Sequence, residues 1–167
     1  EVIAGKLCYV MEYADVKVAV TRQGGHMAPV TFFRNQNPDN QILGNQNLGE
    51  GIVKPVQPYY VSPWQEETAD PAADIGTAVD PAADSTILPV LQPLRGDLFC
   101  MPFGGDGEEF PPHGETASHE WHPAGIERNG TMAVMTLKLQ TRIRPGSVTK
   151  EITAVEGHDA LYIRHTI

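Results

Sequence analysis

The feature that most constrains the fold is the final third of the chain, where tight turns separate stretches of alternating apolar and polar residues. Asn129-Gly130 is a typical hairpin turn, and Pro145-Gly146 and Glu156-Gly157 mark two more turns. Between these turns, every second residue is apolar, which is the pattern of a strand with one buried face. We expect the buried face to hold Ala133, Met135, Leu137, Leu139, Ile143, Val148, Ile152 and Ala154, with Ile163, His165 and Ile167 sharing one face of a last strand over 161–167.

The first part of the chain carries the same kind of pattern. The valines of Asp15–Thr21 fall on one face, and residues 27–33 predict a second strand after a turn at 22–25. No window keeps a helical period of 3.6 residues over three turns, and the 167 residues include 16 glycines and 14 prolines. The sequence therefore predicts one all-β domain over 1–167, an antiparallel sandwich.

One acidic segment interrupts this pattern. Asp-Pro-Ala-Ala-Asp occurs at 70–74 and again at 80–84. Two copies are too few for a repeat architecture. We interpret residues 68–88 as an acidic excursion on the surface.

Charge and cysteine content narrow the classes of partner. Twelve basic and twenty-one acidic residues give a formal charge of −9, which repels nucleic acid. No apolar run is long enough to cross a bilayer, and the first residues are not typical of a signal peptide. We expect no nucleic-acid or membrane partner, a cytoplasmic location, and Cys8 and Cys100 as free thiols.

Two glycine-containing segments could carry chemistry. Gly24-Gly25-His26 lies between two predicted strands, and a turn that needs positive φ explains it better than a phosphate loop, because no helix follows. In Leu94-Arg95-Gly96-Asp97, Arg95 either pairs with Asp97 or makes bidentate hydrogen bonds to the hydroxyls of a sugar or to an anion.

The segment 111–122 is the densest in polar residues. A metal site of the kind found in cupin enzymes is one interpretation, but the spacing does not match, and a group of loop histidines is favoured. Trp121 could instead stack on a sugar ring while its polar neighbours bind hydroxyls. The metal interpretation would use His113, Glu115, His119 and His122.

Three of these segments together resemble the aldose 1-epimerase (galactose mutarotase-like) superfamily. Residues 24–30 look like its early strand–turn–strand, and 94–104 are similar to the Arg-Gly…Cys-x-Pro…Gly strand of the glucose-6-phosphate 1-epimerase-like branch. His113-Gly114 followed by Trp121 resembles the next segment of that branch. The resemblance implies a galactose mutarotase-like supersandwich with Arg95 and His113 facing a sugar and Trp121 in the wall or core beside it.

The chain also departs from this family. Ala117 stands where the branch has an arginine, which argues against a sugar phosphate. The catalytic histidine and glutamate of the family lie in strands beyond the last residue, so we expect a fold lacking its final strands and an incomplete catalytic apparatus.

We therefore predict a carbohydrate-binding domain that needs no cofactor. Its ligand is a sugar or a sugar-derived molecule, and its enzymatic status as an isomerase stays open. Two alternatives are a cupin-like metal-dependent enzyme and a non-catalytic interaction domain whose last strand is covered by a second copy or by a missing segment. The candidate contacts are Arg95, His113 and Trp121, then Glu115, His119 and Glu120, and then His26.

Overall fold

A computed structural model describes residues 1–33, 56–59, 95–102 and 113–167. The predicted acidic excursion over 68–88 lies outside these residues. Within them the protein has eight strands and no helix, and therefore no helix capable of spanning a membrane. The strands are β1 (Val2–Ile3), β2 (Lys6–Tyr13), β3 (Val16–Thr21), β4 (Met27–Phe32), β5 (His122–Asn129), β6 (Met132–Thr141), β7 (Gly146–Val155) and β8 (Leu161–Thr166).

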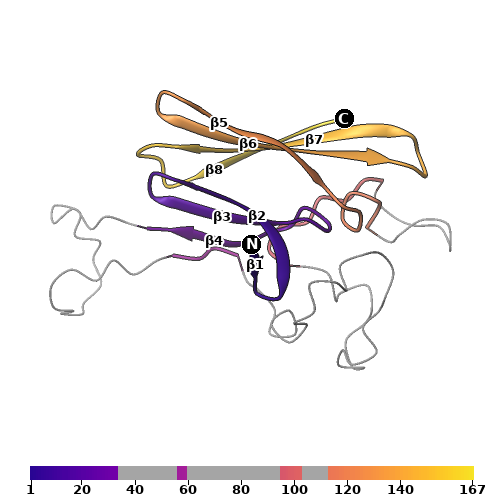
Figure 1. The fold of residues 1–167 in the computed structure, drawn as a ribbon, viewed down its shortest axis with the longest axis horizontal. Helices are drawn as coiled ribbons and strands as arrows, with labels where there is room; N and C mark the ends of the chain where they lie inside the picture. The colour runs from indigo at the N-terminus through magenta and orange to yellow at the C-terminus, as the bar shows by residue number, and fades with distance from the viewer. Residues whose placement is uncertain (34–55, 60–94, 103–112) are drawn as a thin grey trace, which may run out of the picture.

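The strands form two antiparallel sheets, each with its strands in chain order. One sheet has the order β1-β2-β3-β4 and the other β5-β6-β7-β8. Figure 1 shows the second sheet stacked on the first, with the N-terminus at the lower sheet and the C-terminus at the upper one. The predicted all-β sandwich is confirmed.

The alternation of the sequence places the core between the sheets. Ala133, Met135, Leu137 and Leu139 of β6 are buried, as predicted, and so are Val148, Ile152 and Ala154 of β7. From the first sheet, β3 and β4 contribute buried valines and Met27 to the same cluster. Burying these side chains is the main force that holds the two sheets together.

Three features of the sheets differ from the sequence prediction. Ile143 lies in the β6–β7 turn and is exposed, because β6 ends at Thr141. Lys150 occupies an inward position of β7 between Val148 and Ile152 and is 1% exposed. Strands β1, β2 and β5 were not predicted, and β5 is exposed along its whole length.

β8 lies at an edge of the second sheet. It pairs with β7 alone among the described strands, from Ala154↔Leu161 to Thr149↔Thr166. On the face that β8 shares with the inward residues of β7, Leu161 packs against the core, whereas Ile163 is exposed. The expectation that a second copy or a further segment covers this strand stays a prediction.

Candidate functional site

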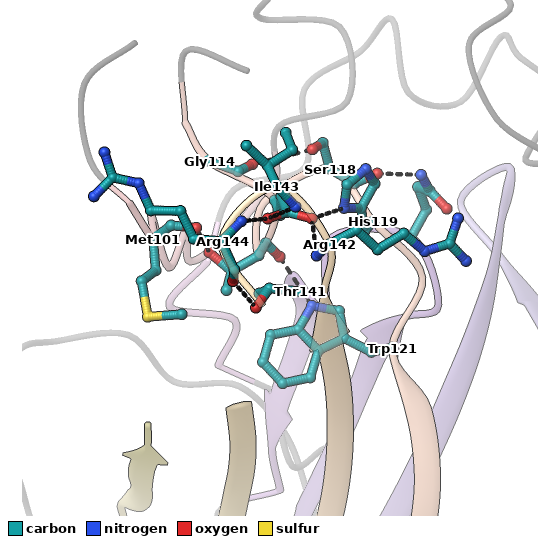
Figure 2. A network of polar contacts seen from close by, with 12 residues as sticks. Met101, Gly114, Ser118, His119, Trp121, Thr141, Arg142, Ile143 and Arg144 are labelled. Carbon is teal, nitrogen blue, oxygen red and sulfur yellow. Dashed lines mark hydrogen bonds and ion pairs between the residues drawn. The ribbon is translucent and has the colours of Figure 1, made fainter. Parts of the chain in front are cut away.

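The loop over 113–121, which sequence reasoning marked as the densest polar segment, forms a short turn packed against the β6–β7 hairpin. The backbone N–H groups of Ser118 and His119 both donate to the carbonyl of Glu115, which closes one helical turn. Gly114 pairs with Met101 in a parallel bridge, so the loop lies beside the 95–102 segment. Figure 2 shows this loop facing the turn that carries Arg142, Ile143 and Arg144.

Glu115 joins these two turns. Its carboxylate accepts hydrogen bonds from the backbone N–H groups of Arg142 at 2.6 Å, Ile143 at 3.0 Å and Arg144 at 3.4 Å. His119 Nδ1 lies 3.3 Å from the same carboxylate. With 1% of its surface exposed, Glu115 is committed to holding the β6–β7 turn rather than to a ligand.

Trp121 differs from the expectation of a stacking surface. Its side chain is fully buried, its Nε1 donates to the carbonyl of Thr116 at 2.9 Å, and Tyr9 Oη donates to its carbonyl at 3.1 Å. Gly25 has φ +62°, and a Cβ there would come within 2.8 Å of the indole nitrogen. Gly25 therefore allows the backbone to approach the indole ring, and Trp121 belongs to the core.

Arg95 also lies inside the molecule, with 4% of its surface exposed. Its guanidinium donates to the carbonyl groups of Ile3, Ala4 and Ala28 at 3.2, 2.5 and 3.4 Å. These hydrogen bonds connect the β1–β2 turn to β4. They engage guanidinium N–H groups of Arg95 that were expected to face a sugar. The structure therefore gives Arg95 a structural role.

The remaining predicted residues vary in exposure. His26 is buried, with Nε2 3.1 Å from the carbonyl of Ala117. Glu120 accepts a hydrogen bond from Arg22 near the surface. His113 is half-buried beside the Met101–Gly114 bridge, and His122 is exposed at the start of β5. Within the part of the chain that the structure describes, no three His, Cys, Asp or Glu side chains form a group that could hold a metal ion.

A second polar cluster, which sequence reasoning did not assemble, lies on the inward face of β7 and β8. Lys150 Nζ donates to Asp97 Oδ2 at 2.9 Å and to the carbonyl of Gly25 at 2.7 Å. Asp97 also accepts a hydrogen bond from the backbone N–H of Met27. His165 is the cross-strand partner of Lys150 and therefore shares its face of the sheet. We call these three residues the Asp97–Lys150–His165 cluster.

Two aromatic side chains accompany this cluster. The ring of Phe99 stacks on that of His165, with centroids 3.9 Å apart and planes 5° from parallel. Tyr59 lies close enough to Asp97 for the carboxylate charge to add to burial in raising the pKa of its phenol. The cluster thus combines an ion pair, an imidazole and aromatic rings.

His165 is the member of the cluster with unused hydrogen-bonding capacity. Its Nε2 is buried and has no hydrogen-bond partner among the described residues. Burial lowers the pKa of the imidazole, the positive charge of Lys150 lowers it further, and Asp97 acts in the opposite direction. The ring is therefore neutral at neutral pH, and its buried Nε2 keeps an unused hydrogen-bonding position with respect to the described residues.

A sequence signal for the cluster existed at one position. Val148-Thr149-Lys150-Glu151-Ile152 alternates with a lysine at an inward place, and a charge on an apolar face predicts a buried partner. The partner, Asp97, is 53 residues away and could not be identified from local pattern.

Comparisons with protein-family models, with curated protein sequences and with solved structures find no match to this chain.

Proposed function

We propose that this chain is a carbohydrate-binding β-sandwich domain of the aldose 1-epimerase-like type, in which a sugar contacts the Asp97–Lys150–His165 cluster. The observation that carries the proposal is the buried Nε2 of His165, which has no hydrogen-bond partner among the described residues and lies next to an aromatic ring and an ion pair. Buried polar atoms in folded proteins are almost always hydrogen-bonded, so an exception needs an explanation, and a missing ligand is one.

The chemistry of the cluster supports a sugar as that ligand. Sugars present hydroxyl groups together with apolar C–H faces, and small-molecule sites combine aromatic side chains with a few placed polar groups. The cluster is close to charge balance, since Lys150 offsets Asp97 and the imidazole is neutral. The overall charge of −9 also disfavours a polyanionic partner.

A binding comparison between two histidine variants tests this proposal. In His165→Ala, D-glucose or D-galactose should bind about two- to tenfold more weakly, because one hydrogen bond to the ligand is lost. The matched control is His158→Ala, since His158 lies in the exposed turn before β8 and its ring forms a hydrogen bond with the Tyr162 hydroxyl, away from the cluster. Isothermal titration calorimetry of the three proteins gives the dissociation constants. Equal affinities in all three would contradict the proposal.

An interaction domain is the second candidate, favoured by the apolar residues that β8 exposes. Tyr162 is 50% exposed, and Ile163 and Ile167 are exposed beside it. If a second copy covers this edge, Ile163→Lys should weaken self-association, whereas Ile126→Lys on β5 at the opposite edge of the sheet should not. Sedimentation velocity over a range of concentrations measures the association. A chain that stays monomeric at every concentration would rule out this candidate for a second copy.

A further inference from the structure

His165 has one buried ring nitrogen without a hydrogen-bond partner among the described residues, while the rest of the side chain is held in place. β8 fixes the backbone through its pairing with β7, and Phe99 holds the ring by stacking at 3.9 Å. Orienting a ring in this way removes rotamer freedom before a ligand arrives, which makes each hydrogen bond to it more effective. The Nε2 that has no partner in the described part of the chain therefore has a fixed position.

The charged groups around the imidazole come from two elements. From β7, Lys150 faces it across the sheet, and from the 95–102 segment, Asp97 faces it through the ion pair with Lys150. On β8 itself, Arg164 points to the opposite face, where it bonds Glu151 at 2.6 Å. A protonated His165 would thus lie next to the buried ammonium group of Lys150. The Asp97 carboxylate, which could offset this charge, already binds Lys150 at 2.9 Å.

We propose that His165 Nε2 binds a hydroxyl group of the sugar and that the sugar and a proton compete for this imidazole. The inference rests on the proposed function and adds to it the contact atom and its dependence on pH. A sugar that covers the ring removes the remaining water from it, and loss of water disfavours the charged form of histidine. Bound sugar therefore lowers the affinity of the ring for a proton, and by reciprocity a proton lowers the affinity for the sugar.

The direction of the pH effect follows from this competition. Binding is strongest where the imidazole of the free protein is neutral, and it weakens as the pH falls through the pKa of that imidazole. Since one proton is involved, the dissociation constant should rise by at most about tenfold for each pH unit below that pKa.

The test measures binding of D-glucose and D-galactose to the full chain at pH 8, 7, 6 and 5, with circular dichroism to show that the protein stays folded at each pH. We expect affinity to fall toward pH 5 in the natural chain. In His165→Gln, which keeps a hydrogen-bonding side chain but cannot titrate in this range, binding should persist and should not change with pH. The control His158→Gln should retain the pH dependence of the natural chain.

Each outcome has a defined meaning. If neither sugar binds at pH 8, the proposed function and the inference both fail. If sugar binds equally at pH 8 and pH 5, or if His165→Gln keeps the pH dependence, the inference fails while the proposed function stands. A proton NMR titration of the His165 ring provides the reciprocal measurement, because saturating sugar should lower the pKa of His165.

Discussion

Lys150 shows how a single side chain can serve both the stability of this sandwich and its candidate site. Its ammonium group is buried, and burial lowers its pKa while Asp97 opposes that shift. Its bond to the carbonyl of Gly25 also satisfies a backbone group in the turn that packs against Trp121. The side chain therefore connects β7, the 95–102 segment and the β3–β4 turn.

Replacing this lysine should destabilise the fold. Lys150→Met keeps much of the side-chain volume but leaves the Asp97 carboxylate and the Gly25 carbonyl without their partner, at a cost of about 2–4 kcal/mol. Urea unfolding measures the loss. Lys138→Met is the matched control, because Lys138 is exposed on the outer face of β6 and its loss should cost less than about 0.5 kcal/mol. Equal midpoints for the two variants would show that the buried ion pair does not contribute.

At the scale of elements, the β6–β7 turn depends on a side chain from another part of the chain. Three of its backbone N–H groups donate to the Glu115 carboxylate. Glu115→Gln places an amide group where an acceptor is needed and should cost roughly 1–3 kcal/mol. Hydrogen exchange at the amides of 142–144 should become faster in this variant.

Glu120→Gln is the control for that change. Glu120 is about two-fifths exposed and pairs with Arg22 at the surface, where an ion pair contributes roughly 0–1 kcal/mol. Exchange at 142–144 should not respond to it. If Glu115→Gln also leaves these amides protected, the carboxylate does not hold the turn.

The strands that could be predicted from the sequence are those whose side chains alternate between a buried face and an exposed face. β3, β4, β6, β7 and β8 were predicted, since they alternate between a wet face and an apolar face or continue such a run. β5 has both faces exposed and contains Pro123 and Gly125, so no alternation marks it. β2 contains six apolar or aromatic residues with no clean period. Pairing with a neighbouring strand, rather than local preference, decides these two elements.

The candidate site was less predictable than the fold for a similar reason. A polar loop residue such as Glu115 becomes buried when distant backbone donors surround it, and its partners lie 27–29 residues away. Arg95 and Ile3 are 92 residues apart. The sequence identified Glu115 and Arg95 as candidate site residues. Their hydrogen-bond partners, however, are distant in sequence and are brought to them only by folding.

At the scale of the whole molecule, catalysis of epimerisation would need more chemical groups than the proposed binding of a sugar needs. Epimerisation at the anomeric carbon needs a base for the hydroxyl proton and an acid for the ring oxygen. In the described cluster, the Asp97 carboxylate and the Lys150 ammonium are engaged with each other, and His165 alone has a nitrogen to offer. A site that binds the substrate and the transition state equally does not accelerate the chemical step.

We therefore expect the 167-residue chain alone to show no mutarotation of glucose or galactose above background. Polarimetry on fresh α-D-glucose measures the rate. An enhancement that disappears in His165→Ala would contradict this expectation and would make His165 a catalytic residue. An enhancement that requires added metal would instead favour the cupin-like alternative.

The order of the strands also has a consequence for the time course of folding. Each sheet is a meander of neighbours in sequence, with β1–β4 inside residues 2–32 and β5–β8 inside 122–166. Contacts between the sheets join residues more than one hundred positions apart, such as Tyr9 to Trp121 and Gly25 to Lys150. Hairpins between neighbours close in microseconds, whereas distant contacts must first overcome the entropy of a long loop. Docking of the two meanders is then the slow event, and substitutions at the interface between the sheets should slow folding, because their contacts form in that step.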